Sequence, residues 1–258
     1  MNSISVKLDR DITELELIPI SDTHIGDPSV NEQKVAELIR YVDDHPNTYA
    51  LLNGDLMNNA IKSSKSDTYT EYLSPMEQMV KLVNMIRPIS HKILAVTQGN
   101  HERRTWKESG VDITRLMCRE LGLEDRYAEG MAYIFLRFGE TNGKNHNRQQ
   151  RYTILITHGS GGGKSVGSKA NRLADLVSIA DADIYIYGHT HQTIAFKEGF
   201  IRVDPCSDSV RDVDRLFVNS GAYMQWGGYA EQNQYRPSVI VTPHIHLSGT
   251  DRKMTVTF

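Results

Sequence analysis

Short apolar runs alternate with amphipathic segments along the first two thirds of this chain. Runs typical of buried strands lie at 15–20, 49–52, 92–97, 131–138, 151–157 and 183–187. Segments whose apolar residues recur at helical spacing predict helices at 31–43, 75–87, 111–121 and 169–180. Beyond residue 187 the pattern becomes mostly β, and the polar–apolar alternation of 252–258 predicts a half-exposed strand.

This order of elements predicts an α/β fold with a mixed sheet, or two stacked sheets, and helices outside. One reservation concerns Pro19 in the first strand, because proline cannot donate a ladder hydrogen bond. The segments 56–75, 140–150 and 159–168 have the composition of loops. With neither an internal repeat nor a linker rich in Pro, Gly or Ser, we expect a single domain over residues 1–258.

Metal-ligating residue types follow the predicted strands in a fixed order. The motifs are Asp22-Thr23-His24, Gly54-Asp55, Gly99-Asn100-His101-Glu102, His158 and Gly188-His189-Thr190-His191. In open α/β sheets the carboxyl ends of the strands form the ligand-binding edge. A single DxH or HxH occurs often by chance, whereas all five motifs in this order, each just after a strand, make coincidence improbable.

The spacing suggests how these side chains could hold metal. Asp22 and His24 are two apart, so in an extended backbone they share a side and could chelate one ion, and His189 and His191 repeat that spacing. Asp55 is the natural bridge, because one carboxylate can serve two ions. Carboxylate, imidazole and amide ligands without thiolate favour Mn²⁺, Fe or Zn²⁺.

The set D-x-H, G-D, G-N-H-[DE], H, G-H-x-H resembles the calcineurin-like metallophosphoesterase superfamily. The resemblance covers residues 22–191, and the segment 219–221 is similar to a turn that often follows in that family. It implies two stacked mixed β-sheets flanked by helices, a four-layer α-β-β-α sandwich. It also implies two divalent metal ions, with Mn²⁺ expected and Fe, Zn²⁺ or Ni²⁺ as alternatives.

The resemblance further assigns roles to the motif residues. One ion would be held by Asp22, His24, Asp55 and His191. The other would be held by Asp55, Asn100, His158 and His189. His101, beside Asn100, would act in catalysis by meeting the phosphate and protonating the leaving oxygen, while a metal-activated hydroxide attacks phosphorus.

Every expected position is filled, so an enzyme is favoured over the protein-binding scaffold to which some relatives have been reduced. The substrate stays open between nucleic acid, small nucleotides or other small diesters, and phosphomonoesters or phosphoproteins. The last is least favoured, because the segments 22–27 and 54–59 depart from the GDxHG and GDxxDRG patterns of the phosphatase branch. We expect a phosphodiester substrate, with DNA or RNA first.

Other residues give weaker indications. The stretch 141–172 is basic and free of acidic residues, and we expect Lys164 to contact substrate phosphate. Of Arg103 and Arg104, which follow closely after His101, one could reach that phosphate, and Arg103 is the residue we assign. The run 158–165 does not fit a P-loop, because three residues rather than four separate its first and last glycines. Glu102 could orient His101 or cap the following turn. Four aromatic residues are candidates for base stacking, with packing the commoner role: Trp106, Tyr223, Trp226 and Tyr229.

Composition adds limits rather than a function. The formal net charge of −3 gives no overall field toward nucleic acid or membranes. Two cysteines give no disulfide framework and fit a reducing compartment. Charged residues near the N-terminus argue against a signal peptide, and no apolar run approaches a membrane span. We therefore expect a cytoplasmic protein without membrane partners, with a homodimer as an open alternative to a monomer.

Overall fold

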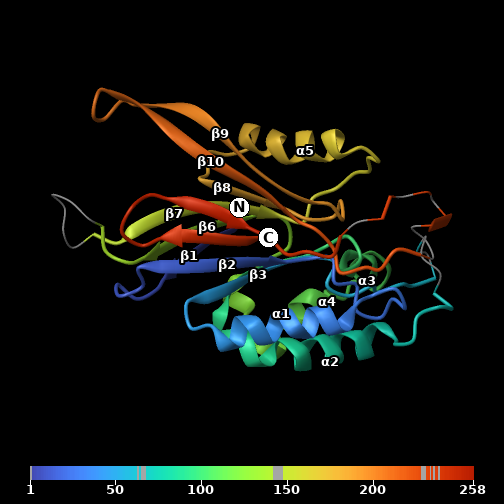
Figure 1. The fold of residues 1–258 in the computed structure, drawn as a ribbon. Coiled ribbons are helices and arrows are strands. Elements are labelled where there is room, and N and C mark those ends of the chain that lie inside the picture. The colour runs from blue at the N-terminus through green and yellow to red at the C-terminus, as the bar shows by residue number, and fades with distance from the viewer. Residues whose placement is uncertain are drawn as a thin grey trace.

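Two six-stranded β-sheets stack face to face in this computed structural model, and helices cover their outer faces (Figure 1). The structure describes residues 2–62, 64, 68–141, 148–227, 231–232, 234, 236–237 and 239–258. Both sheets are mixed, as the sequence predicts. None of the helices among these residues has the length and apolar character needed to cross a membrane.

The two sheets draw on both halves of the chain. Sheet A has the order β1 (Asn2–Lys7), β6 (Ala132–Phe138), β7 (Gln150–Thr157), β8 (Ile184–Tyr187), β10 (Ser209–Ser220) and β9 (Thr193–Asp204). Sheet B has the order β12 (Met254–Thr257), β11 (His244–Ser248), β2 (Glu14–Ile20), β3 (Thr48–Asn53), β4 (Ile93–Thr97) and β5 (Tyr127–Ala128). Strands β2, β3 and β4 are mutually parallel, and β7 is parallel to β8. The carboxyl ends of each parallel set therefore lie at one edge of its sheet.

Side-chain alternation along the strands builds separate apolar layers. In β2 and β3, Leu17 and Leu51 belong to the core between the sheets, whereas Ile18 and Leu52 belong to the core under the helices. The longer helices are α1 (Glu32–Asp44), α2 (Pro75–Ile86), α3 (Glu102–Ser109), α4 (Ile113–Leu121) and α5 (Val166–Ala174). Helices α1, α2 and α4 pack on sheet B, and α5 packs on sheet A (Figure 1). This is the four-layer sandwich expected from the sequence.

Two helical regions depart from the sequence prediction. The helix expected at 169–180 is α5 followed by a 3₁₀ turn at Asp175–Ser178. It starts earlier because the Ser165 side chain caps it by accepting from the N–H of Ser168, so the loop expected at 159–168 ends before residue 166. Helix α3 was not predicted. Its sequence is polar, and only Glu102 is buried.

Pro19 lies within β2, a central strand of sheet B, although a residue without an N–H is not expected there. The antiparallel ladder with β11 extends only to Leu17, and beyond that point β2 pairs with β3 alone, Pro19 lying opposite Leu51. Proline is tolerated here because the ladder on one side of the strand has already ended.

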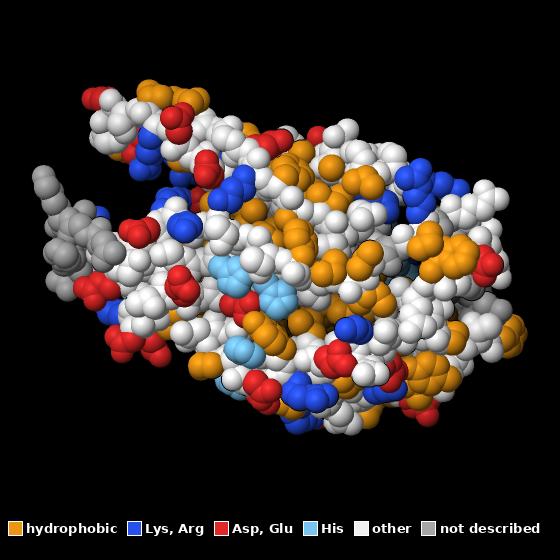
Figure 2. Space-filling model, in the orientation of Figure 1, with side chains coloured by type: hydrophobic (Ala, Val, Ile, Leu, Met, Phe, Trp, Pro, Cys, Tyr) orange, Lys and Arg blue, Asp and Glu red, His pale blue; other side chains and the backbone are white. Residues whose placement is uncertain are grey.

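A partly buried carboxylate, that of Glu16, connects β2 with β3, β11 and α1 near the amino end of β2. Glu16 accepts hydrogen bonds from Thr48 Oγ1 at 2.7 Å, from Tyr41 at 3.1 Å and from His244 Nδ1 at 2.7 Å. This partner of His244 is not evident from the sequence, because Glu16 lies 228 residues earlier in the chain. Figure 2 shows several histidines over the part of this face where β11 and α1 lie, with acidic and basic side chains interspersed around them.

This cluster predicts an acid-sensitive contribution to stability. Burial raises the pKa of Glu16, but the hydrogen bonds from His244 and Thr48 outweigh it and lower the pKa to about 2. Because the folded-state pKa is depressed, the stabilisation is complete above the unfolded value near 4.5 and is lost as the pH falls toward 2. Glu16→Gln should lower the free energy of unfolding at pH 7 by about 2 kcal/mol after allowance for solvent screening.

The measurement is urea denaturation of wild type and Glu16→Gln between pH 7 and pH 2.5. The difference between the two proteins should shrink as the pH falls. Glu14→Gln is the matched control, because Glu14 lies on the same strand and is exposed. A difference that stays constant over this range would contradict the assigned pKa.

Candidate metal centre

The sequence motifs converge where the two sheets meet at their carboxyl ends. The loops after β2, β3 and β4 come from sheet B, and those after β7 and β8 come from sheet A. Hydrogen bonds tie the two sets together: Asn53 Nδ2 donates to the Thr157 carbonyl at 3.0 Å, and the His189 N–H donates to Asp22 Oδ2 at 3.0 Å. The site is therefore shared between the sheets rather than built on either alone.

The candidate ligands sit on tightly turned backbone. Positive φ angles occur at Asp22 (51°), His24 (43°), Asp55 (48°), His189 (63°) and His191 (54°). The expectation that the DxH and HxH pairs use extended backbone is therefore wrong. Left-handed conformations cost a non-glycine residue roughly 1–2 kcal/mol, and such strain concentrates at functional sites. The turns swing these side chains into one cluster immediately after their strands.

Two glycines make the close approach of these loops possible. A Cβ on Gly99 would lie 2.1 Å from the backbone N of Asp55, and one on Gly54 would lie 2.6 Å from Gly99 Cα. Both distances are far below van der Waals contact. The glycines of the G-D and G-N-H motifs are thus required because the β3 and β4 loops touch backbone to backbone.

The first group of ligand atoms comes from the loops that follow β2 and β8. His191 Nε2 lies 3.2 Å from Asp22 Oδ1 and 3.1 Å from His24 Nε2. These atoms all lie within 4.8 Å of one another. Asp22 and His24 are buried, and His191 is partly exposed.

The second group comes from β3, β4, β7 and β8. Asp55, His158 and His189 offer ligand atoms within 4.8 Å of one another. His158 Nε2 lies 3.1 Å from Asp55 Oδ2 and 3.2 Å from Asn100 Oδ1. His158 Nδ1 donates to the Asn53 carbonyl at 2.8 Å, which directs Nε2 into the cluster.

Asp55 lies between the two groups. Besides its place in the second group, its carboxylate lies within 4.8 Å of ligand atoms of His24 and His101. Its Oδ2 is 3.7 Å from His101 Nε2, and its Oδ1 accepts from the His101 N–H at 2.8 Å. This position suits a bridging carboxylate, although the division of ligands between two ions stays a prediction.

The donor set fits divalent metal ions. Among the described residues, Asp22 Oδ1 and His24 Nδ1 are buried polar atoms without a hydrogen-bond partner, and an unsatisfied buried carboxylate oxygen is costly unless a cation meets it. The candidate ligands are carboxylate, imidazole and amide groups, which suit Mn²⁺, Fe or Zn²⁺ better than thiolate-seeking metals.

Opposed charges set the electrostatics of the centre. Burial raises the pKa of Asp55, but the charges of His158 and His101 outweigh it and hold the pKa well below its usual value. Burial lowers the pKa of His158, yet Asp55 and Asp22 overcome this and raise it to about 10. Burial is the main cause of the lowered pKa values of His24, His101 and His189. Metal bound here would have to displace the His158 proton.

His101 borders the cluster and is held at both ring nitrogens. Its Nδ1 donates to the Asn58 carbonyl at 2.8 Å, and Arg104 Nη2 donates to its Nε2 at 3.0 Å. The ring stacks edge-on against His24, with centroids 4.5 Å apart. Its side chain is 16% exposed, so the ring is partly accessible from solvent.

Glu102 has a different role from either one the sequence suggests. Its carboxylate is buried and accepts the backbone N–H groups of Asp55 (3.0 Å), Leu56 (2.6 Å), Met57 (3.0 Å) and Gly99 (3.0 Å). It therefore orders the β3 and β4 loops rather than the ring of His101. Burial and the neighbouring Asp55 raise its pKa to about 7.

The predicted substrate contacts lie farther from the cluster. Arg103 is exposed and its Nη2 lies 3.8 Å from Glu129 Oε1, while Lys164 is exposed on the loop after β7. Hydrogen bonds hold this glycine-rich loop in place. The Tyr187 hydroxyl donates to the Ser160 carbonyl at 2.8 Å, and Arg172 donates to the same carbonyl at 3.3 Å. The roles of Arg103 and Lys164 stay predictions.

The aromatic candidates divide between core and surface. Tyr223 is buried and packs with the core under the helices, so stacking on a base is excluded for it. Trp106 and Trp226 are about half exposed, at 47% and 49%. Tyr229 lies outside the described residues, as does Lys144 of the basic stretch.

The carboxyl end of β10 supports the loop after β8. Asn219 Nδ2 donates to Thr190 Oγ1 at 2.6 Å, between the two histidines of the HxH pair. Ser220 Oγ donates to the Tyr187 carbonyl at 3.2 Å. The resemblance of 219–221 to a family turn thus corresponds to a structural support for His189 and His191.

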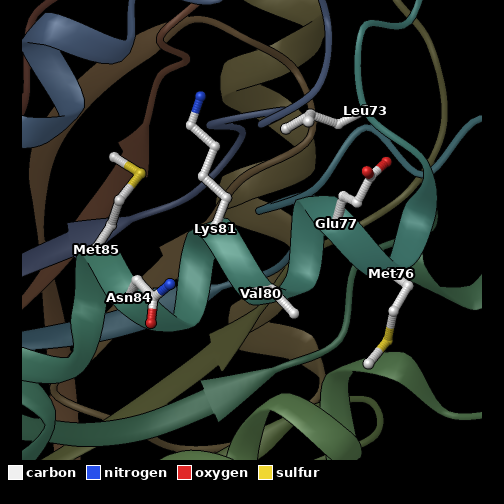
Figure 3. A pocket seen from close by; sticks show the side chains of 7 residues that line it. All are labelled: Leu73, Met76, Glu77, Val80, Lys81, Asn84 and Met85. Carbon is white, nitrogen blue, oxygen red and sulfur yellow. The ribbon is translucent and has the colours of Figure 1, made fainter.

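A surface hollow of about 590 Å³ lies elsewhere, over the outer face of α2 (Figure 3). Its lining includes Leu73, Met76, Val80, Lys81 and Met85. Figure 3 shows the Met76 and Val80 side chains directed away from Lys81. None of the lining residues belongs to the candidate metal centre, so the centre is identified by its ligands and not by this hollow.

Comparison with known proteins gives one family match and several structural likenesses. A model described as calcineurin-like phosphoesterase matches residues 18–193. No curated protein matches the chain in sequence. A Streptococcus pneumoniae protein described as a predicted phosphoesterase is 17% identical (95% of this chain and 88% of that chain covered, TM-score 0.39).

Two further solved structures are similar to this chain. A metallophosphoesterase from Sphaerobacter thermophilus is 14% identical, with 94% of this chain and 86% of that chain covered and a TM-score of 0.44. Vps29 of Chaetomium thermophilum is 13% identical, with 94% of this chain and 96% of that chain covered and a TM-score of 0.43.

Proposed function

The chain belongs to the calcineurin-like phosphoesterase family, and from this premise we propose that it is a dinuclear-metal phosphodiesterase acting on nucleic acid or nucleotides. The observation that carries the proposal is the placement of Asp55 between two groups of ligand atoms, with His101 beside it. We propose Mn²⁺ as the working metal. We also propose a cytoplasmic location, because Cys118 and Cys206 are both unpaired thiols.

The residues present would hold two divalent ions. One ion would be held by Asp22, His24 and His191, and the other by Asn100, His158 and His189. Asp55 lies between the two groups and could serve both ions. When bound, such ions polarise phosphoryl oxygens and lower the pKa of water toward neutrality. The chain itself supplies the strained loops that fix the ligands before metal arrives.

His101 is proposed as the general acid for the leaving group. The Asn58 carbonyl accepts from Nδ1 and so keeps Nε2 as the atom that faces the centre. In its imidazolium form the ring carries a second proton, at Nε2, and passing that proton to the leaving oxygen would avoid an alkoxide product and return the neutral ring with its N–H on the Asn58 carbonyl. The neighbouring N–H of the same residue fixes Asp55 Oδ1, which couples the position of the acid to that of the bridging carboxylate.

The nucleic-acid or nucleotide preference has support from the surroundings of the site. Lys164, Lys169 and Arg172 follow His158 without an intervening acidic residue, and Trp106 is half exposed on the helix that follows His101. Small phosphodiesters are the alternative substrates, because they would need none of these contacts.

The test uses Mn²⁺-loaded protein with bis-p-nitrophenyl phosphate, cyclic nucleotides, and single- and double-stranded DNA and RNA. We expect turnover of the small diester and of at least one nucleic-acid substrate. Turnover of bis-p-nitrophenyl phosphate with cleavage of neither cyclic nucleotides nor nucleic acid would leave only the alternative. If two ions bind and neither these diesters nor p-nitrophenyl phosphate, a monoester, is hydrolysed, the scaffold interpretation replaces the proposal.

The proposed role of His101 predicts a loss that depends on the leaving group. His101→Ala should retain both ions, since His101 is not in either ligand set. It should lower kcat by ~10²–10⁴-fold for an alkyl leaving group, which needs protonation. The loss for p-nitrophenyl esters should be much smaller, because p-nitrophenolate leaves without a proton.

The measurement is steady-state kinetics on a methyl and a p-nitrophenyl ester of the same phosphate, with metal content determined by mass spectrometry. His91→Gln is the control, because His91 is exposed and remote from the motifs. Equal losses on both esters would rule out proton donation by His101.

A further inference from the structure

Two consecutive arginines follow His101, and helix α3 sends them to different places. Arg103 is exposed, with Nη2 3.8 Å from Glu129 Oε1. Arg104 is partly buried and turns back to the site, where Nη1 donates to the Asn58 carbonyl and Nη2 donates to His101 Nε2, both at 3.0 Å. The residue that the sequence singles out for phosphate is therefore not the one that reaches the centre.

A single carbonyl positions both Arg104 and His101. The Asn58 oxygen accepts from His101 Nδ1 at 2.8 Å as well as from Arg104 Nη1. Asn58 itself is buried and fixed, because its N–H donates to the Ile25 carbonyl at 3.0 Å and its Nδ2 donates to Glu71 Oε1 at 2.6 Å. The guanidinium and the imidazole thus stand side by side in a fixed relation.

The position of the guanidinium suits a phosphate oxygen. His101 Nε2 is 3.7 Å from Asp55 Oδ2, so Arg104 Nη2, bonded to Nε2, lies at the border of the metal centre. Guanidinium is a planar fork of donors, and its bonds to an anionic oxygen are about twice as strong as those to a neutral acceptor. A phosphoryl group at the centre would therefore compete successfully with the ring nitrogen for Nη2.

We propose that Arg104 binds a non-bridging oxygen of the substrate phosphoryl group and is a substrate-binding residue of this site. The assignment rests on the proposed function for the identity of the substrate as a phosphoester. When Nη2 leaves His101 Nε2 for the phosphoryl oxygen, Nε2 becomes free to take up the proton that the proposed acid role requires, which it cannot carry while it accepts from Nη2. The Asn58 carbonyl, which holds Nη1, keeps the guanidinium in place during that exchange.

The experiment measures binding of inorganic phosphate to the Mn²⁺-loaded protein by isothermal titration calorimetry. Arg104→Ala should weaken phosphate binding ~10–100-fold, the range expected for one charge-assisted bond, with metal content unchanged. Arg104→Lys should recover part of the affinity, since it restores charge without the fork. Lys107→Ala is the matched control, because Lys107 is an exposed cation on the same helix with no assigned role, and its phosphate affinity should stay within about twofold of wild type.

Kinetics on bis-p-nitrophenyl phosphate give the second readout. Arg104→Ala should raise KM as well as lower kcat, and thermal denaturation should show that each variant is folded. Equal phosphate affinity in Arg104→Ala and Lys107→Ala would overturn the proposal. A fall in kcat with unchanged phosphate affinity would also overturn it, because Arg104 would then only hold His101. If wild type hydrolyses no ester, the phosphate titration still decides the role of Arg104 while the proposed function fails.

Discussion

Replacing Asp55 with asparagine is expected to weaken metal binding by at least ~100-fold and to remove measurable turnover. Even groups that only orient metal ligands cost ~10–100-fold when they are changed, and Asp55 is placed as a ligand between both groups. Its Oδ2 lies 3.1 Å from His158 Nε2 and 3.7 Å from His101 Nε2. Without its negative charge, two cations would face each other with no anion between them.

Metal content after dialysis and competition with a chelating dye measure this effect. Asp125→Asn is the control, because Asp125 is exposed and far along the chain from every motif. Asparagine keeps the shape of the side chain, so a loss reports the charge and not a cavity. Unchanged stoichiometry and affinity in Asp55→Asn would contradict the bridging assignment.

The same substitution has a consequence in the metal-free protein. Despite the opposing effect of burial, Asp55 and Asp22 raise the pKa of His158 to about 10. A raised histidine pKa stabilises the fold fully below the unfolded value near 6.5 and progressively less as the pH rises toward 10. Metal-free Asp55→Asn should therefore be less stable than wild type at pH 6, with a difference that narrows by pH 10. Denaturation in the presence of a chelator measures this.

The sequence indicates where the candidate ligands lie, because the end of each apolar run marks the end of a strand. The apolar runs before Asp22, Asp55 and His158 correspond to β2, β3 and β7, and parallel strands bring their carboxyl ends to one edge. Residue type then suffices to name candidate ligands. The hydrophobic pattern does not reveal the backbone turn at each ligand. A positive φ at an aspartate or histidine does not change the spacing of apolar residues, so it cannot be inferred from that spacing.

The directions of the two arginine side chains on α3 could not be predicted from the sequence either. Arg103 and Arg104 are chemically equivalent in the sequence, and only the phase of α3 separates them. That helix lacks an apolar face, so its phase could not be inferred. Strand β1 was missed as well, because only Ile4 of its residues is buried and its partner β6 is remote in sequence.

Replacing Glu102 with alanine is expected to lower the free energy of unfolding by about 3–5 kcal/mol. Its carboxylate is the acceptor for four backbone N–H groups in two loops, those of Asp55, Leu56, Met57 and Gly99. A buried donor left unpaired costs about 1–3 kcal/mol, and water entering the space would satisfy some of the four. For a domain of this size the melting temperature should fall by roughly 10 °C.

Measurement at pH 8 keeps the carboxylate ionised in wild type, since burial raises its pKa to about 7. Glu108→Ala, an exposed change on the same helix, should alter stability little. Glu102→Gln should fall between the two. Its carbonyl can still accept at the position of Oε1, from Leu56 and Met57, but its amide N–H would oppose the donors of Asp55 and Gly99. If Glu102→Ala melted like Glu108→Ala, the two loops would have to be ordered by other contacts, and the preorganisation of Asp55 could not be credited to Glu102.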